Sequence, residues 1–308
     1  MATDLNKLLT EQRNAGTADI DLLPVEEILK KINAEDKTVA LAVEKAIPQI
    51  AALVERAVEV LDAGGRLIYI GAGTSGRIGI LDASECPPTF GVTPDTIQCL
   101  MAGGERAYVK SAEGAEDSTE AAVEDLIRIN LTAADMVIGI TASGRTPYAI
   151  AGVKYAKDID CSTGSISTAA NSEIAKLVDY PIEAVTGPEV IAGSTRMKSG
   201  TAQKLICNMI STTTMIKLGK VYQNLMIDVQ PTNEKLVHRA RNILVQAAGI
   251  SYEEAVTSLE KYQTVKKALF SLLSGVEPLD AVEGYLERAK GNIRKALELA
   301  RDDQGNRD

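Results

Sequence analysis

The chain has 308 residues and a formal net charge of -9; 45% of its residues are hydrophobic and 24% are charged. This composition is typical of a globular protein with a substantial core, organised as one large domain with an appendage or as two smaller domains. The negative charge argues against nucleic acid and anionic membranes as partners, and no apolar run reaches the length of a membrane span.

The scarce residue types limit the chemistry further. His238 is the only histidine, which excludes a metal site built from several histidines. The N-terminus lacks the basic and then apolar pattern of an export signal. In such a chain, cysteines without a Cys-x-x-Cys pair predict reduced, buried thiols and a cytoplasmic protein. They are Cys86, Cys99, Cys161 and Cys207.

Helices are expected before any strand. A polar arm precedes Pro24, which is well suited to begin a helix. A longer helix is predicted by one sustained apolar stripe from Val43 to Leu61, and Gly64 would end it. The stripe is interpreted as a core-facing surface, with a packing face for a second subunit as the alternative.

Short apolar runs then alternate with helical patterns, which favours a parallel sheet with helices on both faces. The predicted strands are Leu67–Ile70, Ile97–Met101, Met136–Thr141, Ser162–Ser167 and a weak one near Tyr180–Ile182. The helices between them are expected near Arg77–Ala83, Thr119–Ile129 and Pro147–Lys157. Ligands of such sheets bind at the carboxyl ends of the strands.

Only helices are expected after the sheet. An apolar helix over Thr201–Leu218 comes first, and the tail predicts a small helical bundle. The helices of the tail are expected near Asn233–Ala247, Ser251–Lys261, Val265–Leu273, Leu279–Arg288 and Gly291–Arg301. The predicted domains are therefore an α/β domain with N-terminal helices, residues 1–232, and a helical domain, residues 233–308.

A glycine-rich segment, residues 71–77 with the sequence Gly-Ala-Gly-Thr-Ser-Gly-Arg, directly follows the first predicted strand. A strand that leads through glycines into a helix presents free N–H groups, and hydroxyls add donors. The acidic residue of a dinucleotide fingerprint and the Gly-Lys-Ser/Thr of a P-loop are both missing. The pattern predicts a phosphate site at Gly73, Thr74 and Ser75, and a tight turn without a ligand is the alternative.

A second polar loop, residues 141–147, follows the third predicted strand. It contains Ser143, Gly144, Arg145 and Thr146 just before a proline, and this set suits a phosphate monoester. The alternative is that Thr146 caps the next helix while Arg145 is solvated. Both loops occur at equivalent places in one predicted sheet, so a shared site is the preferred interpretation.

A third loop, residues 193–200, supplies further hydroxyls and two cations. Ser194 and Arg196 are its candidate ligand-binding residues. Capping of the following helix by Ser199 or Thr201 explains part of this pattern.

With a single histidine in the chain, carboxylates are the candidate acid–base groups. Glu85 precedes Cys86-Pro87-Pro88, and the prolines predict an extended loop there. Glu113, Glu116 and Asp117 follow the second strand region. Each acid taken singly is better explained as a helix cap or a solvated charge, and the residues alone do not rank them.

Several long motifs together resemble the N-acetylmuramic acid 6-phosphate etherase family. The resemblance covers nearly the whole chain and implies a sugar isomerase (SIS) domain, a three-layer parallel α/β sandwich, with a C-terminal helical bundle. The segments that carry it are Thr10–Asn14, Leu67–Arg77, Leu81–Thr89, Glu113–Asp117, Ala142–Tyr148, Ser194–Lys204 and Thr232–Leu236.

The resemblance also implies an activity. Members of this family cleave the D-lactyl ether of N-acetylmuramic acid 6-phosphate, giving N-acetylglucosamine 6-phosphate and D-lactate by elimination and then addition of water. They serve the recycling of peptidoglycan sugars, use no metal or organic cofactor, and form homodimers. The family's catalytic acid maps onto Glu85 and its second catalytic carboxylate onto Glu116. The alternatives are a phosphosugar isomerase and a phosphosugar-sensing regulator, because glucokinase regulatory protein shares this domain.

Overall fold

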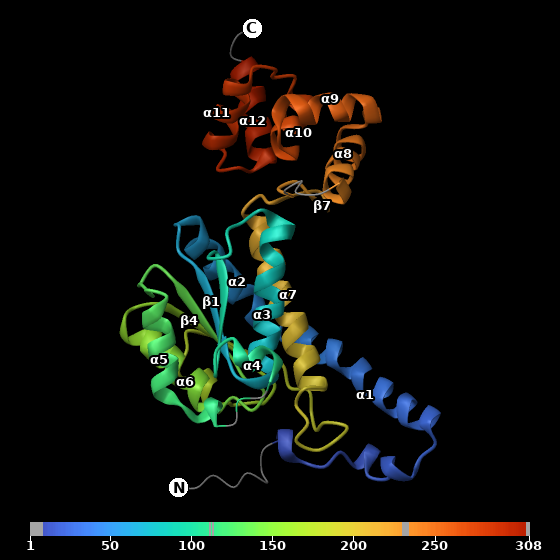
Figure 1. The fold of residues 1–308 in the computed structure, drawn as a ribbon, viewed down its shortest axis with the longest axis vertical. Helices are drawn as coiled ribbons and strands as arrows, with labels where there is room; N and C mark the ends of the chain where they lie inside the picture. Colours follow the sequence, from blue (N-terminus) through green and yellow to red (C-terminus); the bar gives the residue numbers. More distant parts are fainter. Residues whose placement is uncertain (1–8, 111, 113, 230–233, 306–308) are drawn as a thin grey trace. The chain divides into compact units, whose positions relative to one another are not determined.

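The computed structural model describes residues 9–110, 112, 114–229 and 234–305 (Figure 1). The strands are β1 (Leu67–Gly71), β2 (Ile97–Met101), β3 (Met136–Ile140), β4 (Ser162–Ser167), β5 (Tyr180–Glu183), β6 (Val221–Tyr222) and β7 (Leu225–Met226). The α-helices are α1 (Val25–Lys45), α2 (Ile47–Asp62), α3 (Gly73–Phe90), α4 (Arg106–Val109), α5 (Thr119–Arg128), α6 (Pro147–Asp158), α7 (Lys198–Lys217), α8 (Glu234–Ala248), α9 (Tyr252–Tyr262), α10 (Val265–Ser274), α11 (Leu279–Arg288) and α12 (Ile293–Gly305).

The chain divides into two compact units. One comprises Met1–Ser84 and Pro94–Thr212, and the other comprises Glu85–Thr93 and Thr213–Asp308. Both α3 and α7 therefore contribute residues to both units. The domain boundary predicted between residues 232 and 233 lies outside the described residues.

The first unit is built on a parallel sheet with the strand order β2-β1-β3-β4-β5. β1 and β3 are buried along their whole length, as expected of parallel strands covered on both faces. Leu67 of β1 pairs with Met136 of β3 and Gly71 pairs with Ile140, so these two strands end level with each other. The predicted positions of β1 to β5 are confirmed.

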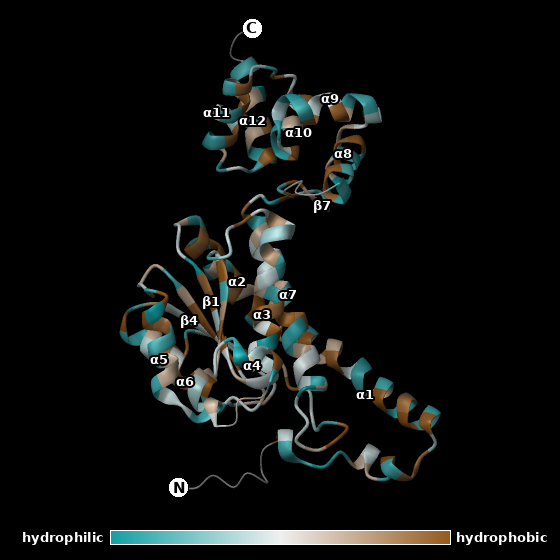
Figure 2. Cartoon of the chain, in the orientation of Figure 1, coloured by the Kyte–Doolittle hydropathy of each residue, from teal (hydrophilic) through white to brown (hydrophobic). Residues whose placement is uncertain are grey.

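Helices cover both faces of this sheet. Ile70 lies against Gly152 of α6, whereas its neighbour Tyr69 faces the other way and lies against Gly79 of α3. α5 packs beside α6, and α2 packs on β1 and β5. In Figure 2, β1 is mostly hydrophobic, whereas β4 is paler. The predicted three-layer α/β sandwich is thus confirmed.

The helix predicted from the apolar stripe between Val43 and Leu61 is in fact two helices. Val43 lies near the end of α1, and Ala46 separates α1 from α2. Pro48 explains the break, because proline has no N–H for the preceding turn yet fits the first turn of a new helix.

The extended loop predicted around Glu85 is wrong. α3 runs through this stretch, so that Glu85, Pro87 and Pro88 are all helical. Cys86 and Phe90, which are four residues apart and therefore on one face of the helix, are both buried. Burial of that face keeps the backbone helical in its last turns, where the prolines remove N–H donors.

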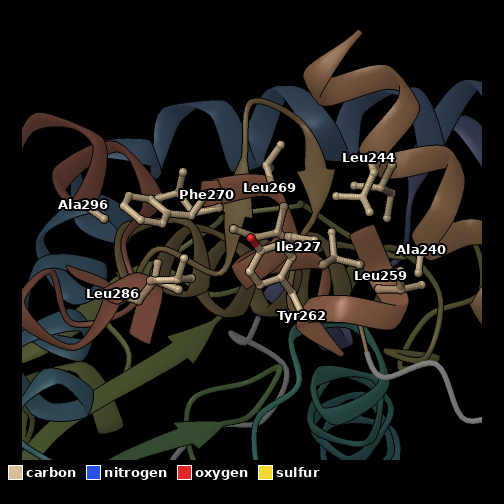
Figure 3. Packing of buried hydrophobic residues seen from close by; sticks show 14 of the residues in the cluster. Ile227, Ala240, Leu244, Leu259, Tyr262, Leu269, Phe270, Leu286 and Ala296 are labelled. Atoms are coloured by element: carbon tan, nitrogen blue, oxygen red, sulfur yellow. The ribbon is translucent and has the colours of Figure 1, made fainter. Parts of the chain in front are cut away.

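The second unit contains the predicted C-terminal helical bundle, together with the β6–β7 hairpin that the sequence did not indicate. Its helices enclose a hydrophobic cluster that includes Ile227, Tyr262 and Phe270 (Figure 3). The Tyr262 hydroxyl donates to the Glu277 carbonyl oxygen at 2.9 Å and accepts from Ser271 Oγ at 2.7 Å. This buried tyrosine therefore keeps its polar end satisfied.

Local signals set the ends of these helices. Ser251 and Glu254 form a capping box at the start of α9, and the Thr264 hydroxyl caps α10. Gly275, with a φ of 74°, ends α10 in the left-handed conformation that glycine adopts without strain.

The cysteines form no disulfide in this structure. Cys86, Cys161 and Cys207 are buried, whereas Cys99 is partly buried. Burial raises the pKa of Cys161 to about 11, so that this thiol stays neutral. No helix in the described part of the chain is long and apolar enough to cross a membrane.

An ion pair fixes the amino ends of the two central strands. Arg66 precedes β1 and Asp135 precedes β3; Arg66 Nε and Nη2 donate to the two Asp135 oxygens at 3.0 and 2.7 Å. The Thr132 N–H also donates to Asp135. Burial raises the pKa of Asp135, but the hydrogen bonds from Arg66 and Thr132 outweigh it and leave this pKa below the usual value.

Replacing Asp135 with asparagine is expected to lower the free energy of unfolding by about 2 kcal/mol, because Arg66 loses its charged partner. In the parent this stabilisation is present above the pKa of an unfolded aspartate, about 3.9, and is lost as the pH falls through the lower pKa of the folded state. Urea unfolding across this pH range should therefore show the parent–variant difference shrinking in acid. The exposed Asp158→Asn is the matched control, and an equal loss in both variants would contradict the assignment.

Candidate active site

The carboxyl ends of β1 and β3 bring two of the predicted phosphate loops to one edge of the sheet. The strand order changes direction at β1, with β2 on one side and β3 on the other, and open parallel sheets bind ligands at such a switch point. The loop of residues 71–77 leaves β1, and the loop of residues 141–147 leaves β3. The prediction that the two loops lie at equivalent places in one sheet is confirmed.

In the first loop, α3 starts almost directly on the end of β1. A Cβ atom at Gly76 would lie 2.7 Å from Met101 Cγ and 2.9 Å from the Gly71 carbonyl oxygen, so only glycine fits here. The N–H groups of residues 73–75 stand at the helix start, where they have no partner within the helix, and Thr74 is half-buried beside them. This positive helix end suits an anion.

Two polar side chains of the first loop make contacts within the fold. The buried Ser75 Oγ donates to Gln203 Oε1 of α7 at 3.0 Å. The Arg77 guanidinium donates to the carbonyl oxygens of Ala107 and Tyr108 at 2.7 and 3.0 Å. These contacts hold α3 against α7 and α4, so the backbone N–H groups of residues 73–75 are the better candidates to bind an anion in this loop.

The second loop is ordered by a glycine and a pair of hydroxyls. Gly144 has a φ of 74°, and a Cβ atom there would lie 2.2 Å from Ser172 Cβ. Thr146 Oγ1 lies 2.8 Å from Thr141 Oγ1 and makes no cap hydrogen bond to α6. The alternative in which Thr146 caps the helix through its hydroxyl is therefore wrong, and this pair stabilises the loop itself.

Ser143 and Arg145 open onto a cavity of about 420 Å³ beside the second loop. Ser172 and Glu173, which follow β4, form its opposite wall. Arg145 Nε lies 3.8 Å from a Glu173 oxygen, and both side chains are partly exposed. A hydroxyl and a guanidinium thus face one solvent-filled space at the carboxyl edge of the sheet.

The third loop leads into α7, whose first N–H groups are already satisfied. The carboxylate of Glu189 accepts from the backbone N–H groups of Lys198 and Ser199, both at 2.9 Å. Capping by Ser199 or Thr201, which the sequence suggested, is therefore wrong. Lys198 Nζ donates to Glu35 Oε2 at 2.7 Å, so this cation is paired within the fold.

The other two candidates of the third loop, Ser194 and Arg196, are more accessible. Ser194 is half-buried and Arg196 is exposed. Neither lines the cavities that contain Ser143 or Glu116.

Glu116 lies beside the first phosphate loop. It belongs to a short 3-10 helix, η5 (Ala115–Asp117), and is exposed. Glu116 and Gly73 line one cavity of about 260 Å³, which Met101 and Gly114 also bound. A carboxylate thus faces the same space as the start of α3. Glu113, the neighbouring candidate, lies outside the described residues.

Glu85 lies on α3 but far along it. It follows Gly73 by twelve residues in one continuous helix, and at about 1.5 Å per residue the two are about 18 Å apart along the axis. Its side chain is exposed. Within one chain the phosphate loops and Glu116 therefore share a sheet edge, whereas Glu85 lies well down the helix from Gly73.

Comparisons with known proteins identify the family. The chain is 53% identical over 294 residues to N-acetylmuramic acid 6-phosphate etherases of Exiguobacterium sp. and Bacillus cereus, covering 95% of this chain and 100% of each relative. The chain belongs to the N-acetylmuramic acid 6-phosphate etherase family. The membership in this family that the sequence motifs predicted is thereby confirmed. Residues 49–157 also match the glucokinase regulatory protein N-terminal SIS domain.

Solved structures similar to this etherase-family chain include two phosphoheptose isomerases. The one from Neisseria gonorrhoeae superposes with a TM-score of 0.47 at 16% identity, covering 62% of this chain and 98% of that chain. The one from Francisella tularensis superposes with a TM-score of 0.45 at 16% identity, covering 62% of this chain and 100% of that chain.

Two residues that support the etherase-family site were not predicted from the sequence. Gln203 holds Ser75 from 128 positions further along the chain, and no local pattern marks that pairing. Glu189 is fully buried at the start of α7. A glutamate within Gly-Pro-Glu, just before a glycine-rich loop, was the only signal, and it does not distinguish a cap from a surface charge.

Proposed function

We propose that this chain cleaves the D-lactyl ether of N-acetylmuramic acid 6-phosphate with Glu116 as the base and Glu85 as the acid. The activity is supported by the 53% identity to named etherases, which extends over 95% of the chain. The observation that carries the assignment of residues is the cavity shared by Glu116 and Gly73, because it puts a carboxylate next to an anion-binding helix start.

Two carboxylates are sufficient for this reaction. In the open-chain aldehyde, the C2 proton is acidic because it neighbours a carbonyl group, and a carboxylate can remove it. The lactyl oxygen on C3 is a poor leaving group, so a second, protonated carboxyl group donates a proton as the C3–O bond breaks. D-lactate leaves, and water then adds across the C2–C3 double bond.

The phosphate loops would anchor the substrate for both steps. The helix start at residues 73–75, Ser143 and Arg145 offer N–H, hydroxyl and guanidinium donors to a phosphate monoester. The whole chain has a net charge of -9, so the positive charge that binds the phosphate must be concentrated at these loops. Binding of the phosphate positions C2 and C3 of the sugar near the acid–base groups.

We infer that Glu85 acts in the site of a second copy of the chain. Five single bonds separate the phosphorus from C3, and at about 1.5 Å each they span no more than about 8 Å. A substrate whose phosphate lies at the start of α3 therefore does not reach Glu85 about 18 Å along the same helix. We infer a homodimer in which each copy supplies Glu85 to the other's phosphate loops.

Exposed apolar side chains support this homodimer. Leu81 is 54% exposed and lies four residues before Glu85, on the same face of α3. Met209 of α7 is also exposed, as are Leu29 and Leu41 of α1. A second copy that covered Leu81 would also lie near Glu85, which is one turn further along the same face of α3.

We also infer that the enzyme works in the cytoplasm on amino sugars recycled from peptidoglycan. Its cysteines form no disulfide, which suits a reducing compartment.

The activity itself is tested by incubating the purified chain with N-acetylmuramic acid 6-phosphate and assaying D-lactate. We expect D-lactate and N-acetylglucosamine 6-phosphate in equal amounts. An isomerised sugar that retains its lactyl group would favour the phosphosugar isomerase, and tight binding without turnover would favour the sensing regulator.

Replacing Ser143 with alanine is expected to weaken binding of the phosphorylated sugar by about 10- to 100-fold, because a charge-assisted hydrogen bond is lost. Arg145→Ala should act in the same direction. Calorimetric titration measures the affinity, and the melting temperature should stay near that of the parent. Ser84→Ala, which removes an exposed hydroxyl on α3, is the control. Parent-like affinity in both loop variants would move the anchor to the start of α3 alone.

Glu85→Gln and Glu116→Ala should fail at different steps. Glu85→Gln should lose D-lactate release by about 10²–10⁴-fold, the usual contribution of a positioned acid, yet still exchange the C2 proton with deuterium from solvent. Glu116→Ala should lose exchange and D-lactate release together, because the first step needs the base. Glu113→Ala is the control. Loss of exchange in that control, with Glu116→Ala still active, would overturn the base assignment.

The shared site predicts that two inactive variants restore each other. When Glu85→Gln and Glu116→Ala chains are mixed and their subunits exchange at random, about half the dimers are hybrids with one intact site, giving about a quarter of the parent activity. If each chain instead carried a complete site, no mixture would contain an intact one. Activity no higher than that of the separate variants would therefore rule out sharing.

A further inference from the structure

The second unit contains a large cavity that the proposed etherase chemistry does not use. Its volume is about 720 Å³, within the range of about 300–1,000 Å³ typical of small-molecule sites. Its walls are the segment of residues 220–229, the start of α10 and the end of α11, closed by Gly91 and Gly291. None of the residues assigned above to catalysis or phosphate binding lines it.

Lysines outnumber carboxylates in these walls. The charged lining residues are Lys220, Lys266, Lys267, Lys290, Asp228 and Glu287. This balance is opposite to that of the whole chain, whose net charge is -9. A concave surface with excess positive charge concentrates anions from solution.

The excess of positive charge lies around Asp228, whose carboxylate two lysines share. Asp228 Oδ2 lies 2.6 Å from Lys266 Nζ and 3.1 Å from Lys220 Nζ, and all three side chains are mostly buried. One carboxylate balances one ammonium group, so this trio carries one net positive charge when both lysines are protonated. Burial lowers the pKa of Lys266, although Asp228 acts in the opposite direction.

The remaining walls define what else the ligand carries. The N-terminal turn of α10, from its cap Thr264 to Lys267, lines the cavity and adds the positive end of a helix. Ile227, Val229 and Leu286 contribute apolar surface. A ligand that joins an anionic group to a less polar group would therefore match both the positively charged walls and the apolar walls of the cavity.

We propose that this cavity is a second binding site, for a small phosphate-bearing metabolite. Its phosphate lies against Lys220 and Lys266 beside the start of α10, and the rest of the molecule packs on Ile227 and Leu286. Two ammonium groups and a helix start suit a dianion better than a single carboxylate, and lysine binds phosphate as a point charge.

Charge variants test this site with inorganic phosphate as the ligand. Calorimetric titrations are made in a Ser143→Ala background, which weakens the proposed phosphate anchor of the etherase site. Adding Lys220→Gln is expected to weaken phosphate binding at least about 10-fold, because the net positive charge of the Lys220, Asp228 and Lys266 trio disappears. Adding Asp228→Asn is expected to tighten it, because the competing carboxylate is removed while both lysines remain.

The control adds Lys295→Gln, an exposed lysine of α12 outside the cavity, and should leave phosphate affinity unchanged. Acetate in place of phosphate should bind weakly to every variant. Unchanged phosphate binding in Lys220→Gln, or no gain in a folded Asp228→Asn, would overturn the proposal. If Asp228→Asn does not fold, Lys220→Gln decides alone, because its side chain is partly exposed. Lys220→Gln should release D-lactate at the same rate as the parent. The test of the second site can therefore fail while the etherase assignment still holds.

Discussion

The close approach of α3 to the end of β1 is the constraint on which the rest of the site depends. Gly71 and Gly76 leave room for it, since a Cβ atom at Gly76 would collide with Met101 and with the backbone of Gly71. Because the helix starts this near the sheet, its free N–H groups stand level with the end of β3, where the second polar loop begins. The polar contacts of Ser75 and Arg77 then keep the helix in place.

The same helix is the basis for proposing that two copies of the chain share the active site. A helix has a fixed rise per residue, so the helix itself holds Glu85 away from the proposed phosphate site at the start of α3. Glu116 of η5 has no such restriction, because it lines the same cavity as Gly73. This separation is why we propose that two copies divide the acid and the base between them, and in that case assembly would be a condition of activity.

Much of the fold was predictable because its signals are local. Short apolar runs between helical patterns located β1 to β5, and helical patterns separated by short breaks located the tail helices. The errors arose where tertiary burial outweighed a local rule. Pro87 and Pro88 indicated a loop, yet burial of Cys86 and Phe90 keeps that stretch in α3.

The site was only partly predictable for a related reason. Motifs gave the phosphate loops and the candidate carboxylates, because glycine turns and hydroxyl clusters are visible in sequence. The partners that fix them were not visible. Gln203 contacts Ser75 across 128 positions, and Glu189 reaches the start of α7 across nine to ten positions without a local pattern that marks the pairing.

The central claim is that the sugar C3–O bond is broken by elimination and remade with water. It is tested most directly by running the reaction in water labelled with ¹⁸O and locating the label by mass spectrometry. Elimination followed by addition leaves the ether oxygen on D-lactate, so the label should appear at C3 of N-acetylglucosamine 6-phosphate, together with solvent hydrogen at C2. Label in D-lactate would instead show water attacking the lactyl carbon, and the roles given to Glu85 and Glu116 would then be wrong.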